Sequence, residues 1–494
     1  MIISVPPEIF LHISEYFPIY EIPATFYSLA LSGRALSNII LPLLWSRLIL
    51  RNERDARTAI QTILQDRGKG ASVQGIYIVS ELSAQTRLDP ESLDVLSALE
   101  RLVETGALPI LQKLELNPVG SSWHQDASGT LHPRQYGQFP TSFWRALERS
   151  CPQLTSLTLR SMDDWSEHGT SFIKESGIFE VQNLTSLTLE PSDAQADTLP
   201  MDGYLEIQFP CLERVMFAGF VLSNTEKATE FWKAHPTLER VHVRHYGWKW
   251  ENVATQHRFS KEAGAIEGLL PNLKYLEAQP FDLLNIPTIV RRLERLTVQS
   301  PRVPTILSQI LTLDFPCLRS LSIIQSQFLV VDAENQTLEA AAALGFENRN
   351  PLERTFVYDL VKTLVYLAPN LEELAIRVHS LIAINCDIIA PDLAHLKNLE
   401  RFFFYDAKWK LESNDYQEGF LESQVRKMAD VCRSLTQVGS LCAPAYGGFP
   451  TAYISRNEDG SVSTIRMGRS RGLIIGDEDR AFPRRQSNLY VTRL

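Results

Sequence analysis

The sequence predicts an α/β fold, a solenoid of stacked repeats in which parallel strands form a sheet and helices cross back between the strands. Three observations predict this. A short leucine phrase recurs along most of the chain, a proline-marked turn precedes many of its copies, and helical apolar spacing fills several of the intervals. A repeat of this kind can bury its apolar side chains only against its neighbours, so stacking of the copies follows from the pattern.

The recurring phrase is Leu-x-x-Leu-x-apolar. Clear copies begin at Leu111, Leu154, Leu184, Leu212, Leu238, Leu273, Leu293, Leu318, Leu371 and Leu399, and weaker ones at Val73 and Leu435. The last two apolar residues of the phrase are two apart, so they point to one side of an extended strand, and the residue between them points to the other. The copies are unevenly spaced, so we expect a leucine-rich-repeat solenoid with the outline of an irregular horseshoe.

Two intervals between copies show the spacing of helices that pack one face on a core. Phe143, Leu147 and Cys151 recur every four residues before one strand, and Leu360 and Leu364 do so before another. A proline follows each pattern and ends the helix before the next strand begins.

The sequence divides into three parts. Residues 1–50 are predicted to form a small helical module, residues 51–442 the irregular repeats, and residues 443–494 a C-terminal hairpin cap and tail. The hairpin is predicted because Asp459 and Gly460 stand between two segments of alternating apolar and polar residues.

The N-terminal segment resembles an F-box. Prolines punctuate three stretches with helical apolar spacing, and the segment ends on a Pro-x-Leu-Trp sequence. The residues that carry the resemblance are Pro6, Glu8, Ile9, Leu29, Ala30, Leu31, Pro42, Leu44 and Trp45. The repeats are similar to those of fungal and other eukaryotic proteins that combine an F-box with leucine-rich repeats.

The resemblance implies a partner. F-box modules dock through apolar residues on a Skp-family adaptor, which joins a cullin-based ubiquitin ligase, while the repeats present a protein substrate. The residues expected to bind the adaptor are Val5, Pro6, Ile9, Leu11, Leu29, Leu31, Leu36, Leu43 and Trp45. The alternative is that these residues form a cap over the apolar face of the first repeat, which solenoids require.

The substrate is expected on the strand face opposite the leucines. Each repeat contributes the residue between its two core positions, and in some repeats the next residue on the same side. The selected candidates are Thr158, Arg160, Thr188, Met216, His242, Arg244, Glu277, Thr297, Arg377, Phe403 and Tyr405. Aromatic and arginine side chains among them are common anchors of protein interfaces.

Composition excludes several classes of protein. The 494 residues carry a net charge of -10, which disfavours general binding to nucleic acid. No uncharged apolar run reaches the length of a membrane helix, and the N-terminus lacks a secretory signal. The six cysteines form no C-x-x-C pair, and four precede a repeat leucine, so we expect small buried thiols in a reducing compartment, cytoplasmic and/or nuclear.

The sequence shows no catalytic motif in the context that its chemistry needs. It has no G-x-G-x-x-G, and its G-x-S-x-G match, GRSRG from Gly468, lies in a basic stretch of the tail and is not read as a nucleophile elbow. Four histidines at 235, 242, 245 and 257 lack a zinc-type spacing, so we expect them on the surface. The prediction is therefore a substrate-recognition subunit of a Skp-cullin-F-box ubiquitin ligase, with no catalytic residue, metal or cofactor of its own. The alternative is a leucine-rich-repeat interaction scaffold with no ligase link.

Overall fold

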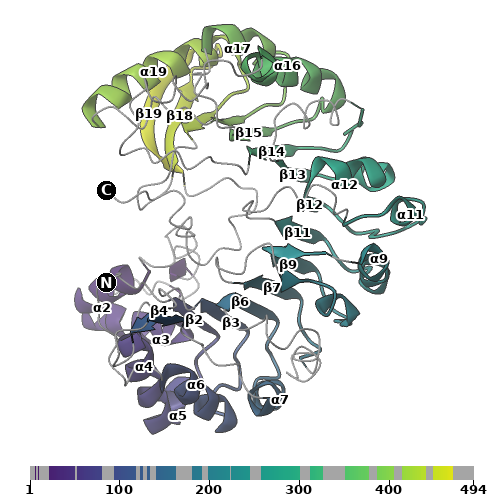
Figure 1. Ribbon diagram of the computed structural model, residues 1–494. Helices are drawn as coiled ribbons and strands as arrows, with labels where there is room; N and C mark the ends of the chain where they lie inside the picture. The colour runs from purple at the N-terminus through teal and green to yellow at the C-terminus, as the bar shows by residue number, and fades with distance from the viewer. Residues whose placement is uncertain are drawn as a thin grey trace. The chain divides into compact units, whose positions relative to one another are not determined.

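The fold is taken from a computed structural model of the chain. It describes residues 6, 9–10, 22–50, 53–79, 94–117, 123–125, 131–133, 141–162, 181–191, 199–222, 224–244, 258–300, 312–325, 351–377, 386–404, 414–440 and 449–470. The chain divides into two compact units. Unit 1 is mainly Met1–Leu238, unit 2 is mainly His257–Leu494, and the segment 239–256 is shared between them. Figure 1 labels their elements, and each unit is described by itself.

Unit 1 begins with helices and continues as a strand ladder. Its helices are α2 (Ile22–Leu31), α3 (Arg34–Ser46), α4 (Glu53–Gln65), α5 (Arg67–Gly70), α6 (Asp94–Glu104), α7 (Thr141–Ser150), the 3-10 helix η3 (Tyr204–Glu206) and α9 (Thr225–Ala234). Its ladder strands are β1 (Arg47–Leu50), β2 (Gly75–Val79), β3 (Lys113–Asn117), β6 (Ser156–Met162), β7 (Ser186–Pro191) and β9 (Arg214–Ala218). Two small separate pairs are β4 (Trp123–Gln125) with β5 (Leu131–Pro133), and β8 (Leu199–Pro200) with β10 (Phe220–Val221).

Unit 2 repeats the same plan. Its helices are α11 (Lys261–Gly264), α12 (Pro280–Asn285), α13 (Pro287–Val290), α16 (Pro351–Leu367), α17 (Cys386–Leu393) and α19 (Asn414–Val431). Its strands are β11 (Arg240–Arg244), assigned to this unit through His242, then β12 (Tyr275–Ala278), β13 (Arg295–Ser300), β14 (Ser320–Gln325), β15 (Glu373–Arg377), β16 (Arg401–Phe404), β17 (Gln437–Ser440), β18 (Phe449–Arg456) and β19 (Val462–Ser470). In each unit the helices that follow the first strand lie along one side of the strands, and α2 and α3 lie at the start of the ladder (Figure 1).

The ladder strands are parallel and follow chain order. In unit 1, β1, β2, β3, β6, β7 and β9 pair in that sequence, and in unit 2 β11 to β17 do the same. The register places the second leucine of each phrase beside its counterpart, as with Leu114 and Leu157 or Leu321 and Leu374. This is the arrangement of a leucine-rich-repeat solenoid, as the phrase predicts, because each strand buries its leucines against the next.

The turn before each strand has a recurrent hydrogen-bond pattern. The amide of the first leucine donates to the carbonyl three residues earlier, as Leu154 does to Cys151 at 3.0 Å. The next two amides both donate to one carbonyl of the preceding repeat; Glu372 and Glu373, for example, donate to Arg319 at 2.8 and 2.9 Å. Because these backbone groups are satisfied between repeats, each turn is fixed to its neighbour.

Side chains add further bonds between successive turns. Asn370 donates from Nδ2 to the carbonyl of Pro316 at 2.8 Å, and the hydroxyl of Thr237 donates to the carbonyl of Leu212 at 2.7 Å.

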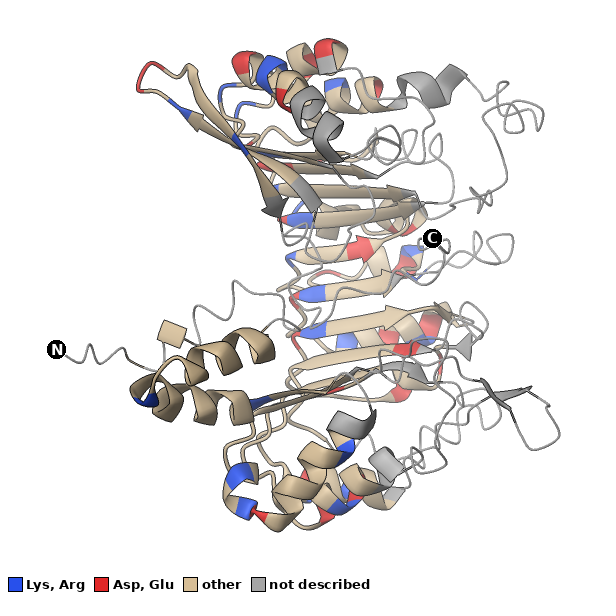
Figure 2. Cartoon of the chain, turned by 90° about the vertical axis from the view of Figure 1, so that its left-hand side faces the viewer, with Lys and Arg blue, Asp and Glu red and all other residues tan. Residues whose placement is uncertain are grey.

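Several strands begin with Lys or Arg, a regularity visible at the strand ends in Figure 2. Repetition of one local solution explains how unevenly spaced repeats still form a regular ladder.

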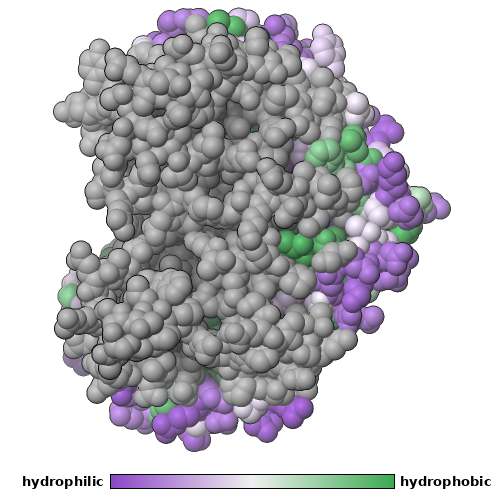
Figure 3. Space-filling view, in the orientation of Figure 1, coloured by the Kyte–Doolittle hydropathy of each residue, from purple (hydrophilic) through white to green (hydrophobic). Residues whose placement is uncertain are grey.

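The helices bury the faces that their spacing predicts. Phe143, Leu147 and Cys151 are at most 2% exposed at α7, and Leu360 and Leu364 are fully buried in α16. On the described part of the face shown in Figure 3, hydrophilic side chains predominate over these outer elements, and hydrophobic ones form small separate areas. Among the described residues, no helix combines the length and the apolar character required to cross a membrane.

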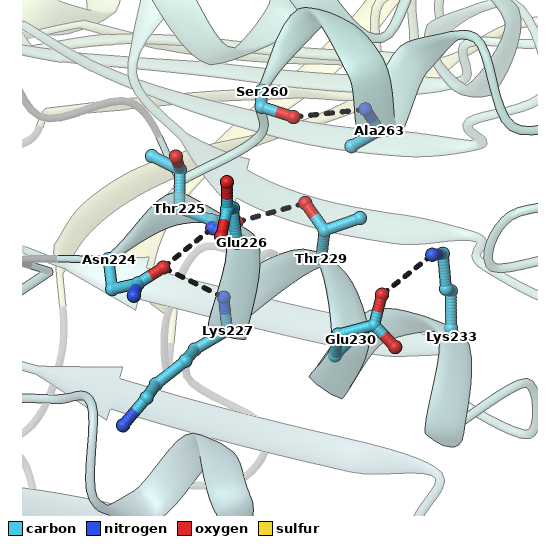
Figure 4. Close-up of polar contacts among 9 residues, drawn as sticks. All are labelled: Asn224, Thr225, Glu226, Lys227, Thr229, Glu230, Lys233, Ser260 and Ala263. Carbon is cyan, nitrogen blue, oxygen red and sulfur yellow. Dashed lines mark hydrogen bonds and ion pairs between the residues drawn. The ribbon is translucent and has the colours of Figure 1, made fainter.

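Two helix starts show capping by polar side chains (Figure 4). Asn224 precedes α9, and its Oδ1 accepts the amides of Glu226 and Lys227 at 2.9 and 3.0 Å. Ser260 precedes α11, and its hydroxyl accepts the amide of Ala263 at 3.0 Å. Both residues satisfy donors that the first turn of a helix leaves without an internal partner.

The predicted C-terminal hairpin is present as β18 and β19, which pair antiparallel through a turn that contains Gly460 at φ 84°. β18 continues the ladder by pairing antiparallel with β17. One side chain fixes the hairpin to the last helical turn. Arg456 donates from Nη2 to the carbonyls of Ala429 and Cys432, both at 2.9 Å, and of Leu435 at 3.2 Å. The guanidinium thus caps the carbonyl end of α19.

Candidate protein-binding surfaces

The strand face opposite the leucines contains the predicted substrate residues in neighbouring strands. In unit 1, Glu115 lies beside Thr158, Thr158 beside Thr188, and Thr188 beside Met216. Thr158 and Thr188 are partly exposed, whereas Glu115 is 5% and Met216 is 9% exposed. The structure therefore aligns these four residues, and the two threonines are accessible in the centre of the row.

The corresponding row in unit 2 is covered. His242, Glu277, Thr297 and Phe403 are only 5%, 0%, 2% and 1% exposed. The sequence predicted that these side chains leave the strand on the side away from the leucines and therefore face solvent. The expectation of exposure is wrong for these four and for Met216, because alternation fixes the side of the sheet but not what packs on that side.

A hydrogen-bonded cluster explains how polar residues are buried in unit 2. Glu277 accepts Gln299 Nε2 at 2.6 Å through Oε1, and its Oε2 lies 3.0 Å from Nδ1 of His242. The hydroxyls of Tyr275 and Thr297 are 3.1 Å apart, and the Tyr275 ring meets the His242 ring edge-on at 4.4 Å. Buried polar atoms are tolerated when they are bonded in this way. The cluster therefore reads as part of the interior of unit 2.

A second buried carboxylate lies further along this face. Glu373 is 1% exposed, accepts the hydroxyl of Ser320 at 2.8 Å, and lies 3.2 Å from Nε of Arg401. Phe403, two residues after Arg401, occupies the space beside Gly439, where an added Cβ would come within 2.4 Å of the Phe403 ring. The glycine is thus required by the close packing of this aromatic side chain.

Other substrate candidates cannot be placed at the level of side chains. Arg160, Arg244 and Arg377 lie in β6, β11 and β15, but their side chains are outside the described structure, and Tyr405 lies outside the described residues. Tyr77, which the prediction omitted, lies beside Glu115 in the same row, and its pKa is raised chiefly by burial. Its repeat carries only the weak phrase that begins at Val73, so the sequence signal was faint.

Two of the four histidines that were predicted to lie on the surface, His235 and His242, are described and are buried. His235 is 1% exposed; its Nε2 accepts the amide of Phe209 at 2.9 Å, and its Nδ1 lies 2.7 Å from the carbonyl of Phe231. His242 belongs to the buried cluster described above, and the histidines at 245 and 257 lie outside the described residues. The prediction of surface histidines is wrong for both described cases. The ring of His235 links two turns, which is a structural role.

The cysteines are of two kinds. Cys151 and Cys432 are buried, and burial raises the pKa of their thiols to about 12 and about 11. Cys211 and Cys317 are exposed, which corrects the expectation that all four cysteines before a repeat leucine are buried. Within the described ranges, no group of three or more His, Cys, Asp or Glu residues is arranged to hold a metal ion.

The N-terminal helices form a small apolar core. Phe10, Ile22, Phe26, Ala30 and Ile40 are its buried members. Partly buried residues packed against it include three of the predicted adaptor-binding residues, Leu29, Leu36 and Leu43. Helix α3 continues through Pro42 to Ser46, so this proline lies inside the helix and does not end it. These three leucines stabilise the module itself.

The same helices leave other apolar residues exposed. Ile9 is 48% and Leu31 is 70% exposed, and both were predicted to bind an adaptor. Tyr27 and Leu41, which were not predicted, are 57% and 42% exposed. Tyr27 and Leu31 are four residues apart in α2, so they share one face of that helix. The spacing of Phe26 and Ala30, one residue earlier in each case, was the signal that could have revealed this.

The remaining predicted adaptor residues differ from one another. Pro6 is exposed, and Val5 and Leu11 lie outside the described residues. Trp45 is partly buried, and Nζ of Lys69 stands 5.1 Å from the centre of its ring. A cation over an indole ring is a stabilising contact, so Trp45 has a structural partner within unit 1.

The chain is similar to solved structures of other proteins. No family model matches the chain, and no curated protein matches it. The leucine-rich repeat-containing protein LegL7 of Legionella pneumophila aligns with a TM-score of 0.38 and 12% identity, over 71% of this chain and 91% of that one. We therefore base the repeat assignment on the strand ladder and leucine columns of this chain itself.

Proposed function

We propose that this protein is a non-catalytic recognition protein, whose repeat ladder binds a protein partner and whose N-terminal helices dock on a Skp-family adaptor. It would then act as the substrate-recognition subunit of a Skp-cullin-F-box ubiquitin ligase in the cytoplasm and/or nucleus. The observation that carries the proposal is the exposure of Leu31, Tyr27 and Ile9 on a helical module that resembles an F-box.

The energetic case for docking rests on these exposed side chains. Most exposed side chains of a soluble protein are polar, and several large apolar ones close in sequence indicate an interaction surface. Leu31 is the most exposed of them at 70%, while its neighbour Ala30 is buried at 7%. Substitution of Leu31 should therefore change the surface and leave the core of the module intact.

The partner-binding part of the proposal concerns the open row of unit 1. Thr158 and Thr188 lie side by side, are partly exposed, and are flanked by the ladder residues Glu115 and Met216. Threonine hydroxyls on a rigid sheet can bind a partner segment by hydrogen bonds at small entropic cost. We expect a protein partner here, consistent with the net charge of -10, which disfavours nucleic acid.

The adaptor test uses the full chain and a purified Skp-family adaptor. The double substitution Tyr27→Asp with Leu31→Asp should weaken binding about 100-fold, the loss expected when interface anchors are removed. The matched control is Tyr366→Asp with Ile388→Asp on helices α16 and α17, where the side chains are 83% and 54% exposed. The control should bind like the unaltered chain, and circular dichroism should show both variants folded.

The alternative is a repeat scaffold with no ligase link. It predicts that the unaltered chain does not bind the adaptor, while proteins captured from a lysate still depend on the ladder. Thr158→Arg with Thr188→Arg should remove that capture and leave adaptor binding unchanged. Equal adaptor binding by the Tyr27/Leu31 variant and the unaltered chain would refute the docking assignment.

A further inference from the structure

The first residues of the ladder strands form a row of their own. Each stands two positions before a residue of the row described above, so it leaves the strand on the same side, away from the leucines. In unit 1 the strand register sets six such residues side by side, and we call them the strand-start row: Arg47, Gly75, Lys113, Ser156, Ser186 and Arg214. Every ionisable member is basic, although the chain as a whole carries a net charge of -10.

The corresponding row of unit 2 contains a carboxylate. Ser320, Glu373 and Arg401 are the first residues of the successive strands β14, β15 and β16. The Glu373 carboxylate accepts the Ser320 hydroxyl at 2.8 Å, and its other oxygen lies 3.2 Å from Nε of Arg401. The two flanking strands thus hold one carboxylate between a serine hydroxyl and an arginine, and Glu373 is only 1% exposed. Unit 2 therefore shows which chemical group this position of the ladder accepts.

Unit 1 has the same kinds of donor but no acid in its row. Ser186 lies beside Arg214, and Ser156 lies beside Lys113. Lys113 is exposed and the other three are partly exposed, so a ligand can reach all four. Hydroxyl, ammonium and guanidinium groups all donate hydrogen bonds to carboxylate oxygens, and the bonds from charged groups are the stronger ones. The carboxylate that unit 2 supplies from its own chain would come from a partner in unit 1.

The acidic side chains near this row are less accessible than the basic ones. Glu115 and Glu190 leave their strands on the same side, but they are only 5% and 8% exposed. Glu213 is exposed, but it precedes β9 and belongs to the turn, where its amide donates to the carbonyl of Thr185 at 2.9 Å. The accessible charges on the described ladder strands of unit 1 are therefore cationic, and such a row attracts an acidic ligand.

We propose that the strand-start row of unit 1 binds an acidic segment of the protein partner. One carboxylate lies between Ser186 and Arg214, and a second lies between Ser156 and Lys113. The inference rests on the proposed function, in which the ladder binds a protein, and adds the chemistry of the bound segment. Adjacent strands are about 4.8 Å apart, so the two pairs of donors are centred about 10 Å from each other. An extended segment rises about 3.4 Å per residue, so two acidic residues about two to four positions apart span this distance.

The first test exposes the full chain to a displayed library of random peptides. The unaltered chain should enrich peptides with two Asp or Glu residues at about that spacing. Lys113→Glu with Arg214→Glu should abolish this enrichment. Arg101→Glu with Arg149→Glu makes the same change of net charge at exposed positions of α6 and α7 and should retain it. Retention by the Lys113/Arg214 variant would overturn the inference.

The same selection separates this inference from the proposed function. Peptides enriched without an excess of acidic residues would overturn the acidic segment and leave partner binding by the ladder intact. If the unaltered chain enriched no peptide, the inference would also fall, and capture of proteins from a lysate would still decide whether the ladder binds a partner.

The second test measures the affinity of an enriched acidic peptide by fluorescence anisotropy. Lys113→Gln, or replacement of the peptide's acidic residues by their amides, should weaken binding about tenfold, the loss expected for a charge-assisted contact. Lys113→Arg keeps the charge and should bind like the unaltered chain, and melting temperatures should show that all variants fold. Single-stranded RNA should not displace the peptide, since the net charge of -10 disfavours nucleic acid. Displacement by RNA, or equal affinity for the acidic and the amide peptides, would contradict the proposal.

Discussion

The N-terminal helices and the strand ladder are stabilised in different ways. The helical module has one small core, whose buried members are Phe10, Ile22, Phe26, Ala30 and Ile40. The ladder is stabilised along its whole length by a column of buried leucines and by backbone hydrogen bonds that recur in each turn. Loss of one side chain should therefore affect the module as a whole but the ladder only near the repeat concerned.

This difference also bears on function. The module combines a core of few residues with exposed apolar side chains such as Tyr27 and Leu31. A surface of this kind is stabilised further when a partner covers it. The ladder instead covers most of its apolar side chains itself, and its accessible row in unit 1 is polar. The module is thus the better candidate for an obligate apolar interface, and the ladder for selective recognition.

The largest expected effect is in the module. Phe26 is 2% exposed, and Phe26→Ala should destabilise the module by about 3–5 kcal/mol through loss of burial and formation of a cavity. Hydrogen exchange should show α2 and α3 opening together while the ladder amides stay protected. Tyr27→Ala, at a 57% exposed neighbour, should leave exchange unchanged. If Phe26→Ala also reduced the protection of the ladder amides against exchange, the helical module and the ladder would not be stabilised independently.

The repeat architecture was predictable because its signal is redundant. Each phrase fixes a strand, a turn and the inward side, and errors in one copy do not shift the others. The register of Leu321 beside Leu374 shows this, since 53 residues separate the two phrases (374 minus 321) and still they align. The hairpin at Asp459 and Gly460 was predictable for the separate reason that its turn requires a residue with positive φ.

Exposure of the candidate sites was harder to predict. Alternation placed Glu277 and Phe403 on the side away from the leucines, but both are buried there. Burial depends on segments distant in sequence, which a local period does not encode. His235 was missed for a similar reason: its partner Phe209 is 26 residues earlier, and only the folded turns bring the two together.

The next largest effect tests the end of the ladder. Arg456→Ala removes the donor that bonds the carbonyls of Ala429, Cys432 and Leu435 at the end of α19 and in the turn after it. We expect a loss of about 3 kcal/mol, as for bonds from a charged group. Chemical denaturation measures the loss, and hydrogen exchange should confine it to α19 and the hairpin. Arg466→Ala removes only an exposed arginine next to Tyr453 and serves as the control. Equal losses for the two variants would exclude a capping role for Arg456.

A smaller effect concerns acid. Burial lowers the pKa of His235 from 6.5, because removal from water disfavours the charged ring, and the bond to the Phe231 carbonyl opposes this shift only in part. The neutral ring is also the form that can accept the amide of Phe209. The folded state therefore binds a proton less readily than the unfolded state. Stability from this residue is complete above pH 6.5 and is lost as the pH falls below that value towards the lowered pKa. Denaturation curves across this range should show it.

Two histidine variants separate this effect from general acid sensitivity. His235→Gln should lower stability at neutral pH and flatten its dependence on pH, since the titrating group is gone. His395→Gln, at an exposed position, should retain the dependence of the unaltered chain. If His395→Gln removed the dependence of stability on pH and His235→Gln did not, the acid sensitivity would not come from the His235 ring.

The smallest effect tests a single cap within the ladder. Asn224 accepts two amides at the start of α9, so Asn224→Ala should cost about 1 kcal/mol, while Asn224→Asp should cost little because its carboxylate accepts the same bonds. A thermal melt compares the three chains. Because repeats share stability with their neighbours, this loss should lower the melting temperature slightly and leave the module's exchange unaffected. If Asn224→Ala also raised amide hydrogen exchange in α2 and α3, the module and the ladder would unfold as one unit. The module would then not have a core that is separate from that of the ladder.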